Sequence, residues 1–216
     1  MASNRIYKMV VLGANGGIGM QTVKLALNAG YSVTAILRTP SNLQISHPNL
    51  QIVRGNVLKL EDLDRHLEDK NIIVSAIGKN SLKKTTLYSQ GNKNVIEAMK
   101  RVGLNRGFFV SASGLEVNPS FSLLIRLATK FILQPVLHNM YADLWRMEEI
   151  IKESNITWTI LRPPKLLNGP ETGKYRISID HFLNKGLEIS RADLPYFIVT
   201  NLTNEAIFKK TVEVAY

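Results

Sequence analysis

Residues 13–19 of the chain read Gly-Ala-Asn-Gly-Gly-Ile-Gly, with glycine at positions 13, 16 and 19. An apolar, β-branched stretch, 6–12, precedes them, and a stretch with helical spacing, 20–29, follows. Between a strand and a helix, this spacing is typical of a dinucleotide-binding turn. The first glycine permits the tight turn, the second admits the pyrophosphate, and the third lets the helix pack on the sheet. Amide groups at the helix start, with the positive end of its dipole, then hold the phosphates. We therefore expect the cofactor contacts to include Gly13, Asn15, Gly16, Gly17, Ile18 and Gly19.

The rest of the chain continues this alternation of short apolar runs and amphipathic stretches. Strands are predicted over 6–12, 32–37, 50–53, 72–76, 108–111, 157–161 and 211–216, and helices over 20–29, 60–67, 92–102, 140–153 and 192–199. Such alternation predicts an α/β fold, with a Rossmann-type, doubly wound, mostly parallel sheet and helices on both faces. The nearly continuous apolar strands agree, because central parallel strands are buried on both sides. We expect a single dinucleotide-binding domain over 1–216, with the less regular residues 163–216 completing its substrate side.

The composition excludes several kinds of site. The 216 residues include no cysteine, which rules out disulfides, thiolate metal sites and cysteine nucleophiles. The four histidines are scattered without carboxylates at ligand spacing, so no metal site is expected. The formal net charge is +10, but no run of five or more basic residues exists. The charge therefore favours an anionic small ligand over nucleic acid.

No signal peptide is visible, so we expect a cytoplasmic protein. No stretch is long and apolar enough to cross a bilayer, and the nearest, 121–137, is interrupted by Arg126 and Lys130. We interpret this segment as a lid or wall of the substrate pocket that can be helical. A membrane-surface amphipathic helix and a dimer contact are the alternatives. The protein is expected to be a monomer or a homodimer.

The second predicted strand ends in Leu37-Arg38-Thr39. In this architecture an acidic residue at that position binds the ribose 2′-hydroxyl of NAD, whereas an arginine accommodates the 2′-phosphate of NADP. Arg38 therefore favours NADP(H), with Thr39 and Ser41 as further donors. A guanidinium can also stack on adenine without selecting for the phosphate, so NAD(H) stays open as the alternative.

Further motifs accompany the glycine turn and Arg38. They read GNV at 55–57, AIG at 76–78, SQGNKNVIEAMKRVG at 89–103, SAS at 111–113, RMEEIIKES at 146–154, LRPPKL at 161–166 and ISRADL at 189–194. With them, nearly the whole chain resembles the atypical NAD(P)-binding branch of the short-chain dehydrogenase/reductase superfamily. That branch includes NmrA-like proteins and flavin reductase (biliverdin-IXβ reductase) proteins.

The resemblance implies a place for each motif along the cofactor. The positions beside the adenosine are Asn56, Val57, Ala76, Ile77 and Gly78, and those around the nicotinamide are Ser111, Ala112, Ser113, Pro163, Pro164 and Lys165. Asn56 departs from the family, whose members usually have aspartate there. Ser111 and Ser113 are the candidate catalytic residues, as donors to a substrate carbonyl or a flavin ring. The alternative is that these serines only satisfy backbone groups at a strand end.

One departure from the superfamily bears on the chemistry. Typical members use Tyr-x-x-x-Lys for proton transfer, but here Tyr141 is followed four residues later by Trp145, and Tyr88 by Asn92. Tyr141 either closes the substrate pocket or only packs. Flavin-reductase-like relatives manage without the pair, since a planar acceptor takes hydride directly and obtains its proton from water. We therefore expect an NADPH-dependent oxidoreductase for a small planar acceptor, a flavin or a quinone. The alternative is an NmrA-like redox sensor that binds NADP(H) without turnover.

Overall fold

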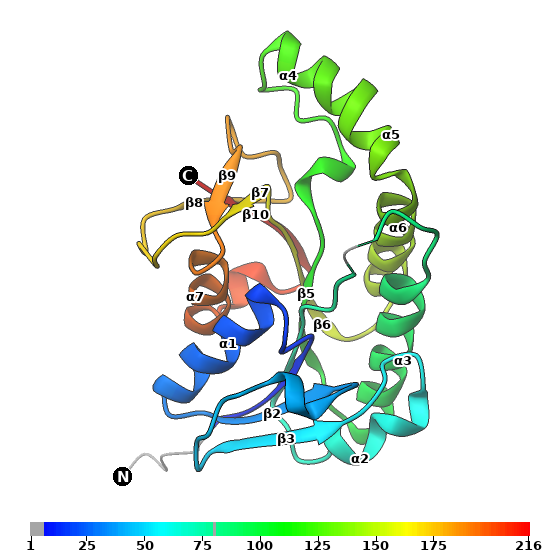
Figure 1. The fold of residues 1–216 in the computed structure, drawn as a ribbon, viewed down its shortest axis with the longest axis vertical. Helices are drawn as coiled ribbons and strands as arrows, with labels where there is room; N and C mark the ends of the chain where they lie inside the picture. The colour runs from blue at the N-terminus through cyan, green and yellow to red at the C-terminus, as the bar shows by residue number, and fades with distance from the viewer. Residues whose placement is uncertain (1–6, 80) are drawn as a thin grey trace.

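A computed structural model describes residues 7–79 and 81–216 (Figure 1), and position 6 of the first predicted strand lies outside them. The strands are β1 (Lys8–Leu12), β2 (Ser32–Leu37), β3 (Leu50–Arg54), β4 (Ile72–Ser75), β5 (Arg106–Val110), β6 (Thr157–Arg162), β7 (Lys165–Leu167), β8 (Arg176–Ile179), β9 (Glu188–Ser190) and β10 (Lys210–Ala215). The α-helices are α1 (Gly17–Asn28), α2 (Asp64–Leu67), α3 (Leu87–Val102), α4 (Leu123–Ala128), α5 (Gln134–Val136), α6 (His138–Lys152) and α7 (Asp193–Thr200). A π-helical turn, Thr129–Leu133, joins α4 to α5, and short 3₁₀ turns lie at Pro40–Asn42, Leu60–Asp62, Ser113–Leu115 and Glu205–Ile207.

The central sheet confirms the predicted fold class. Its strand order is β3-β2-β1-β4-β5-β6-β10-β8, and its neighbours are parallel except for the antiparallel pair β10 and β8. The first six strands therefore have the order of dinucleotide-binding folds. The order reverses between β1 and β4, and sheets of this kind bind their ligands at the carboxyl ends of the strands beside such a reversal.

The core fills both faces of the sheet. In β1, Met9 and Val11 pack with α1 and α7, whereas Val10 and Leu12 pack with α3 and α6 on the opposite face. All four side chains are fully buried. The helix pairs can be followed on the two sides of the strands in Figure 1. Burial on both sides accounts for the continuous apolar runs in the central strands.

Two helices begin three or more residues earlier than the sequence pattern predicts. Helix α1 begins at Gly17 instead of residue 20. The sequence pattern missed its first residues because two of them are glycines, which have low helix propensity. Helix α3 begins at Leu87 instead of residue 92. Its first amides are satisfied from another helix, since Tyr88 N donates to Asp143 Oδ2 of α6 over 2.9 Å. A cap supplied from so far along the chain leaves no local signal.

Three short strands, β7, β8 and β9, also went unpredicted. They have three or four residues each and lie among the proline and glycine residues of the C-terminal third. Strands β7 and β9 form a separate parallel pair, and β8 extends the main sheet beyond β10. The predicted helix at 192–199 and the predicted strand at 211–216 correspond to α7 and β10.

Gly13 permits the close packing of the turn against the end of β4, and Gly19 permits the close packing of α1 against that turn. Gly13 has φ of +75°, and a Cβ added to it would lie 2.3 Å from the Ala76 carbonyl oxygen. A Cβ added to Gly19 would lie 2.3 Å from the Gly13 carbonyl oxygen. Any side chain at either position would push the helix away from the sheet, so the first and third glycines have the packing roles that their spacing predicts.

Replacing a glycine by alanine can cost stability in two ways, through overlap of the added Cβ and through the left-handed backbone conformation. Two glycines of this chain separate these costs. Gly30 has a similar φ of +81° but no atom within 4 Å of an added Cβ. We expect Gly30→Ala to lower the free energy of unfolding by about 1 kcal/mol, from the left-handed conformation alone. Gly13→Ala should cost about 3 kcal/mol, because a backbone overlap is added. Urea unfolding of both variants measures the difference, and equal losses would contradict the close-contact role.

Candidate dinucleotide site and substrate pocket

The glycine turn presents a backbone surface that suits a pyrophosphate. Asn15 and Gly16 are exposed while Ala14 is buried, so the turn's outer edge is open. Gly16 N donates to the Gly13 carbonyl oxygen over 2.9 Å, and Met20 N donates to the Gly16 oxygen over 2.9 Å. The amides of residues 17–19 at the start of α1 have no partner within the helix, and its first turn has no acidic residue. An anion fits this end electrostatically and sterically.

Arg191 lies against the start of α1. A Cβ added to Gly17 would lie 2.4 Å from Arg191 Cδ, which places the arginine stem over the turn. The Arg191 amide donates to the Leu167 carbonyl oxygen over 2.8 Å, and Nε donates to Asn168 Oδ1 over 3.2 Å. The connection between β9 and α7 therefore brings a cation to the predicted pyrophosphate position. Arg191 belongs to the ISRADL motif at 189–194, but the motif alone did not indicate a contact with the glycine turn.

Four basic side chains surround a depression at the carboxyl ends of β2 and β3. The depression has a volume of about 360 Å³ and is lined by Arg38, Arg54, Gly55, Asn56, Lys59, Asp62 and Arg65. Arg38 is exposed at the end of β2, as the sequence predicts, and Thr39 follows it at the start of a 3₁₀ turn. The sequence pattern did not identify Arg54, Lys59 and Arg65, which only the fold brings to Arg38.

Asn56 is engaged on both sides by its own loop. Its backbone N–H donates to Asp62 Oδ2 over 3.0 Å. Its side-chain oxygen, Oδ1, accepts a hydrogen bond from Leu58 N over 3.1 Å. The side-chain NH₂ is the group left for an adenine edge. Residue 56 thus closes a turn as well as lining the basic depression.

The other predicted adenosine positions meet against α3. Val57 is buried, and a Cβ on Gly91 of α3 would lie 3.0 Å from Val57 Cγ2 and 3.2 Å from Ile77 Cδ1. Ala76 and Ile77 are half-buried and Gly78 is exposed at the end of β4. Ala76 and Ile77 lie directly against Gly13 of the turn, and contact of these residues with the cofactor stays a prediction.

An apolar cavity of about 320 Å³ lies where the loops after β5 and β6 meet the segment 121–137. Its lining comprises Ala112, Ser113, Gly114, Glu116, Asn118, Phe121, Ile125, Thr129, Leu133, Leu137, Tyr141, Pro163, Pro164, Lys165, Gly186, Leu187 and Glu213. The structure therefore brings Ser113, Pro163 and Lys165 together, and Ser113 N donates to the Pro163 carbonyl oxygen over 3.0 Å. Segment 121–137 is helical and forms one wall, as the pocket-wall interpretation expects.

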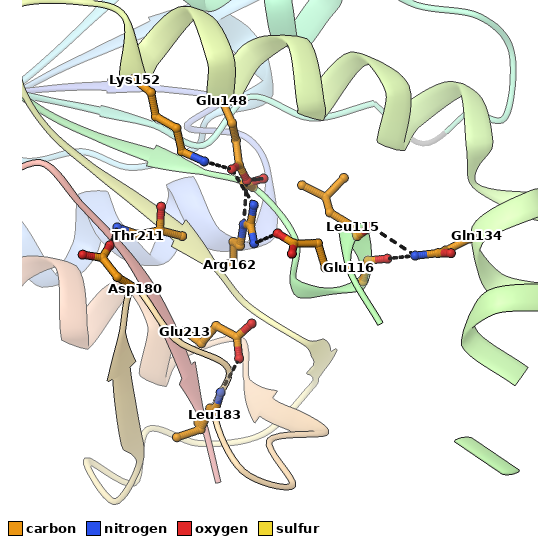
Figure 2. A network of polar contacts seen from close by, with 12 residues as sticks. Leu115, Glu116, Gln134, Glu148, Lys152, Arg162, Asp180, Leu183, Thr211 and Glu213 are labelled. Atoms are coloured by element: carbon orange, nitrogen blue, oxygen red, sulfur yellow. Dashed lines mark hydrogen bonds and ion pairs between the residues drawn. The ribbon is translucent and has the colours of Figure 1, made fainter. Parts of the chain in front are cut away.

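Ser111 does not line the cavity but takes part in a buried ionic network, whose Glu148, Arg162, Glu116 and Lys152 are labelled in Figure 2. Its hydroxyl donates to Glu148 Oε1 over 2.7 Å. Arg162 Nε and Nη2 donate to the two oxygens of Glu148 over 2.8 and 2.7 Å, and Arg162 Nη1 donates to Glu116 Oε1 over 2.6 Å. Burial alone would raise the pKa of Glu148, but Arg162, Ser111 and Lys152 outweigh it, and the pKa lies below its ordinary value. The network joins β5, β6 and α6 behind the cavity.

Glu213 of β10 borders the apolar cavity and a second, more polar cavity of about 380 Å³. Its side chain is buried, and one carboxylate oxygen, Oε2, accepts a hydrogen bond from Leu183 N over 2.7 Å. Burial raises the pKa of Glu213, with Glu116 adding to this effect and Leu183 N–H and Arg162 opposing it. The result is a carboxyl group that holds a proton more readily than usual at the edge of the pocket. It belongs to the final predicted strand, where no motif marked it.

Tyr141 lines the cavity without the partner that typical members use. Burial raises the pKa of its hydroxyl. Trp145 stands at the position of the missing lysine, and its ring centroid lies 5.5 Å from the Arg162 guanidinium carbon. Tyr141 therefore forms part of the cavity wall, and nothing in this arrangement makes it a ready proton donor.

The sequence pattern of the NAD(P)H-binding family matches residues 13–205, from the glycine turn through α7. The chain belongs to this family. The uncharacterized chloroplast protein At2g34460 of Arabidopsis thaliana is 29% identical over 96% of the chain and 76% of its own length.

Two solved structures have the same fold as this family member. A short-chain dehydrogenase/reductase from Veillonella parvula, in complex with NADP, has a TM-score of 0.80 and 18% identity over 97% of this chain and 94% of its own. ChuY, an anaerobillin reductase from Escherichia coli O157:H7, has a TM-score of 0.76 and 21% identity over 96% of each chain. Among the described residues, no helix is long and apolar enough to span a membrane.

The buried network should make stability depend on pH. Because the folded-state pKa of Glu148 is lowered, its stabilisation is present above the ordinary carboxyl pKa and is lost as the pH falls through the folded value. We expect Glu148→Gln to cost about 3 kcal/mol at pH 7, since it leaves Arg162 without its main partner. The cost should shrink toward pH 4. Urea unfolding measures this, with Glu153→Gln at the exposed end of the same helical segment as the control; equal effects of the two variants would refute the network's role.

Proposed function

We propose that the protein is an NADPH-dependent oxidoreductase that reduces a planar acceptor such as a flavin or a quinone. The observation that carries this proposal is the apolar cavity beside Ser113, Pro163 and Lys165, the residues expected to surround the nicotinamide. The cavity opens at the carboxyl side of the sheet and is walled by aliphatic and aromatic side chains. Such a pocket holds a flat apolar ring system better than a sugar or a small polar acid.

The cofactor would be held by backbone at one end and by cations at the other. The turn at Gly13 has no room for side chains, and Arg191 adds a positive charge beside it. The basic depression around Arg38 supports a preference for the additional phosphate of NADP(H), because several guanidinium and ammonium groups converge on one place. The bound cofactor supplies the hydride. The protein's own residues orient the ring, exclude water and supply a proton.

Glu213 is the proposed proton donor. Reduction of the acceptor by NADPH consumes one hydride and one proton and leaves NADP⁺ and the dihydro product. Glu213 borders the acceptor cavity, and its raised pKa favours the protonated form that a general acid needs. Water then restores the proton through the adjoining polar cavity, which Glu213 also borders. This replaces the direct proton uptake from water that the sequence suggests.

The similar structures support the proposal without deciding the acceptor. The Veillonella parvula protein was solved with NADP, and ChuY is described as a reductase of anaerobillin. Both likenesses are below 25% identity and speak for the fold alone. The acceptor is therefore argued from the pocket of this chain.

A non-catalytic NADP(H) sensor is the second candidate. The specific observation in its favour is the bond from the Ser111 hydroxyl to Glu148, which occupies one of the two predicted catalytic serines. A sensor needs the glycine turn and the basic depression but no proton donor. Tight NADP(H) binding without turnover across flavins and quinones would support this candidate against the first.

Calorimetry with NADPH and NADH tests the two cationic positions separately. Arg38→Ala should weaken NADPH binding by roughly 1.5–3 kcal/mol, as for a hydrogen bond to a charged group, and NADH binding much less. Arg191→Ala should weaken both cofactors equally, because both carry the pyrophosphate. Equal losses of NADPH and NADH for Arg38→Ala would refute its phosphate role. A selective loss for Arg191→Ala would refute the pyrophosphate assignment.

Turnover tests the reductase itself and the role of Glu213. Oxidation of NADPH at 340 nm, with FMN or a soluble quinone as acceptor, should exceed the protein-free rate. The wild-type kcat should fall as the pH rises through the raised pKa of Glu213. Glu213→Gln should lower kcat about 100-fold at the acidic end and remove this fall, while the Kd for NADPH stays unchanged.

Glu188→Gln, on the exposed side of β9, is the control for this measurement. No NADPH oxidation above background with any acceptor would exclude the reductase. A Glu213→Gln enzyme with the wild-type pH profile would exclude only the proton assignment.

A further inference from the structure

The segment 121–137 projects from the body of the protein with large apolar side chains on its outside. In Figure 1 it forms the upper end of the molecule, where α4 and α5 stand clear of the sheet. The exposed fraction is 66% for Leu123, 80% for Leu124, 65% for Phe131 and 65% for Ile132. Solvated single leucines are ordinary, but a contiguous set on one projecting helical segment marks an interaction surface.

The same segment is apolar on its inner side as well. Phe121, Ile125, Thr129, Leu133 and Leu137 follow one another at intervals of four and line the substrate cavity. A helix that is hydrophobic all round is expected in a protein core or in a lipid environment, and not between a pocket and water. The inner face borders the cavity, so the outer face is the one that is turned to solvent and needs an occupant.

The charges of the segment indicate which occupant fits. Between residues 117 and 142 the sequence contains Arg126 and Lys130 but no aspartate or glutamate. Both basic residues are exposed among the outer leucines. Long basic side chains can keep their charge at a polar boundary while their stems lie along apolar surface. The pattern of apolar side chains with interspersed cations matches the interface of an anionic bilayer.

A second copy of the chain fits this surface less well. An isologous dimer would bring two copies of the same narrow face together. Its cations would then meet without acidic partners from this stretch, and like charges in an interface are unfavourable.

We propose that the segment 121–137 docks the protein on an anionic lipid surface. The outer side chains, including Leu124 and Phe131, enter the boundary between headgroups and acyl chains, and Arg126 and Lys130 bind lipid phosphates. The cavity on the inner side of the segment is then held next to the lipid, from which an apolar acceptor can enter it. Docking itself is independent of the proposed reductase function, because it requires neither cofactor nor turnover.

Flotation with vesicles tests this proposal directly. The wild-type protein, without cofactor, is mixed with vesicles of phosphatidylcholine alone or with phosphatidylglycerol added. We expect it to float with the anionic vesicles at low salt and to be largely released in 0.5 M NaCl. Leu124→Glu combined with Phe131→Glu should reduce the partition coefficient tenfold or more, because each change removes a large apolar side chain from lipid.

Replacing the cations separates charge from apolar insertion. Arg126→Gln combined with Lys130→Gln should lower partitioning into anionic vesicles about 30-fold, or about 1 kcal/mol for each residue. Binding to neutral vesicles should change little. Ile177→Glu on β8, a position with 45% exposure, is the matched control and should behave as the wild type. Circular dichroism and the unfolding temperature verify that each variant is folded.

Three results would overturn the proposal. The first is wild-type protein that remains unbound with anionic vesicles. The second is an equal loss of binding for Ile177→Glu and for the Leu124/Phe131 variant. The third is a dimer in light scattering that the Leu124/Phe131 variant dissociates while vesicle binding is absent, which would assign the face to a second copy. All three results are obtained without measuring NADPH oxidation. If the docking proposal fails, the reductase proposal is therefore unaffected.

Discussion

The dinucleotide side of the structure depends on how closely the turn before α1 approaches the residue that follows β4. The Gly13 and Ala76 backbones are so near that no Cβ fits between them, and Gly19 of α1 lies equally close to the Gly13 carbonyl. This packing fixes where α1 begins. Arg191, whose stem crosses the helix start, is held there by its bonds to Leu167 and Asn168. A phosphate site of this kind consists mostly of backbone, and its geometry is therefore set before any side chain contributes.

The cavity side of the structure depends on a different kind of constraint. There the loops after β5 and β6 are anchored by the Glu148 and Arg162 pair, which Ser111 and Glu116 complete. A buried ion pair adds little net stability but is costly to break, so it favours one arrangement of its neighbours over others. Here it holds the two loops that line the cavity in fixed relation to α6. Glu213 lies beside this network but outside the ion pair, which leaves its carboxyl group available to the pocket.

Local patterns were sufficient for the parts of the fold that are local in origin. The strand at 32–37 and the glycine turn follow from residues adjacent in the chain. The start of α3 did not, because Asp143 caps it from another helix. Strands β7 to β9 are too short to show alternation. In the site, Arg38 was found because a known turn places it, whereas Arg54, Lys59 and Arg65 reach it only through strand pairing and a following loop. Glu213 is distant in sequence from every other residue of the pocket.

This difference explains why membership of the NAD(P)H-binding family indicates the cofactor but does not identify the ligand of the cavity. Backbone geometry at Gly13 and Gly19 leaves almost no room for a side chain, so these two positions carry much of the dinucleotide-binding pattern of this chain. The cavity wall is formed by side chains at intervals of four along 121–137, where one apolar residue can replace another at modest cost. The ligand of this cavity can therefore differ without any change in the turn. A segment that is apolar on both faces adds a second requirement, because its outer side chains need an environment of their own.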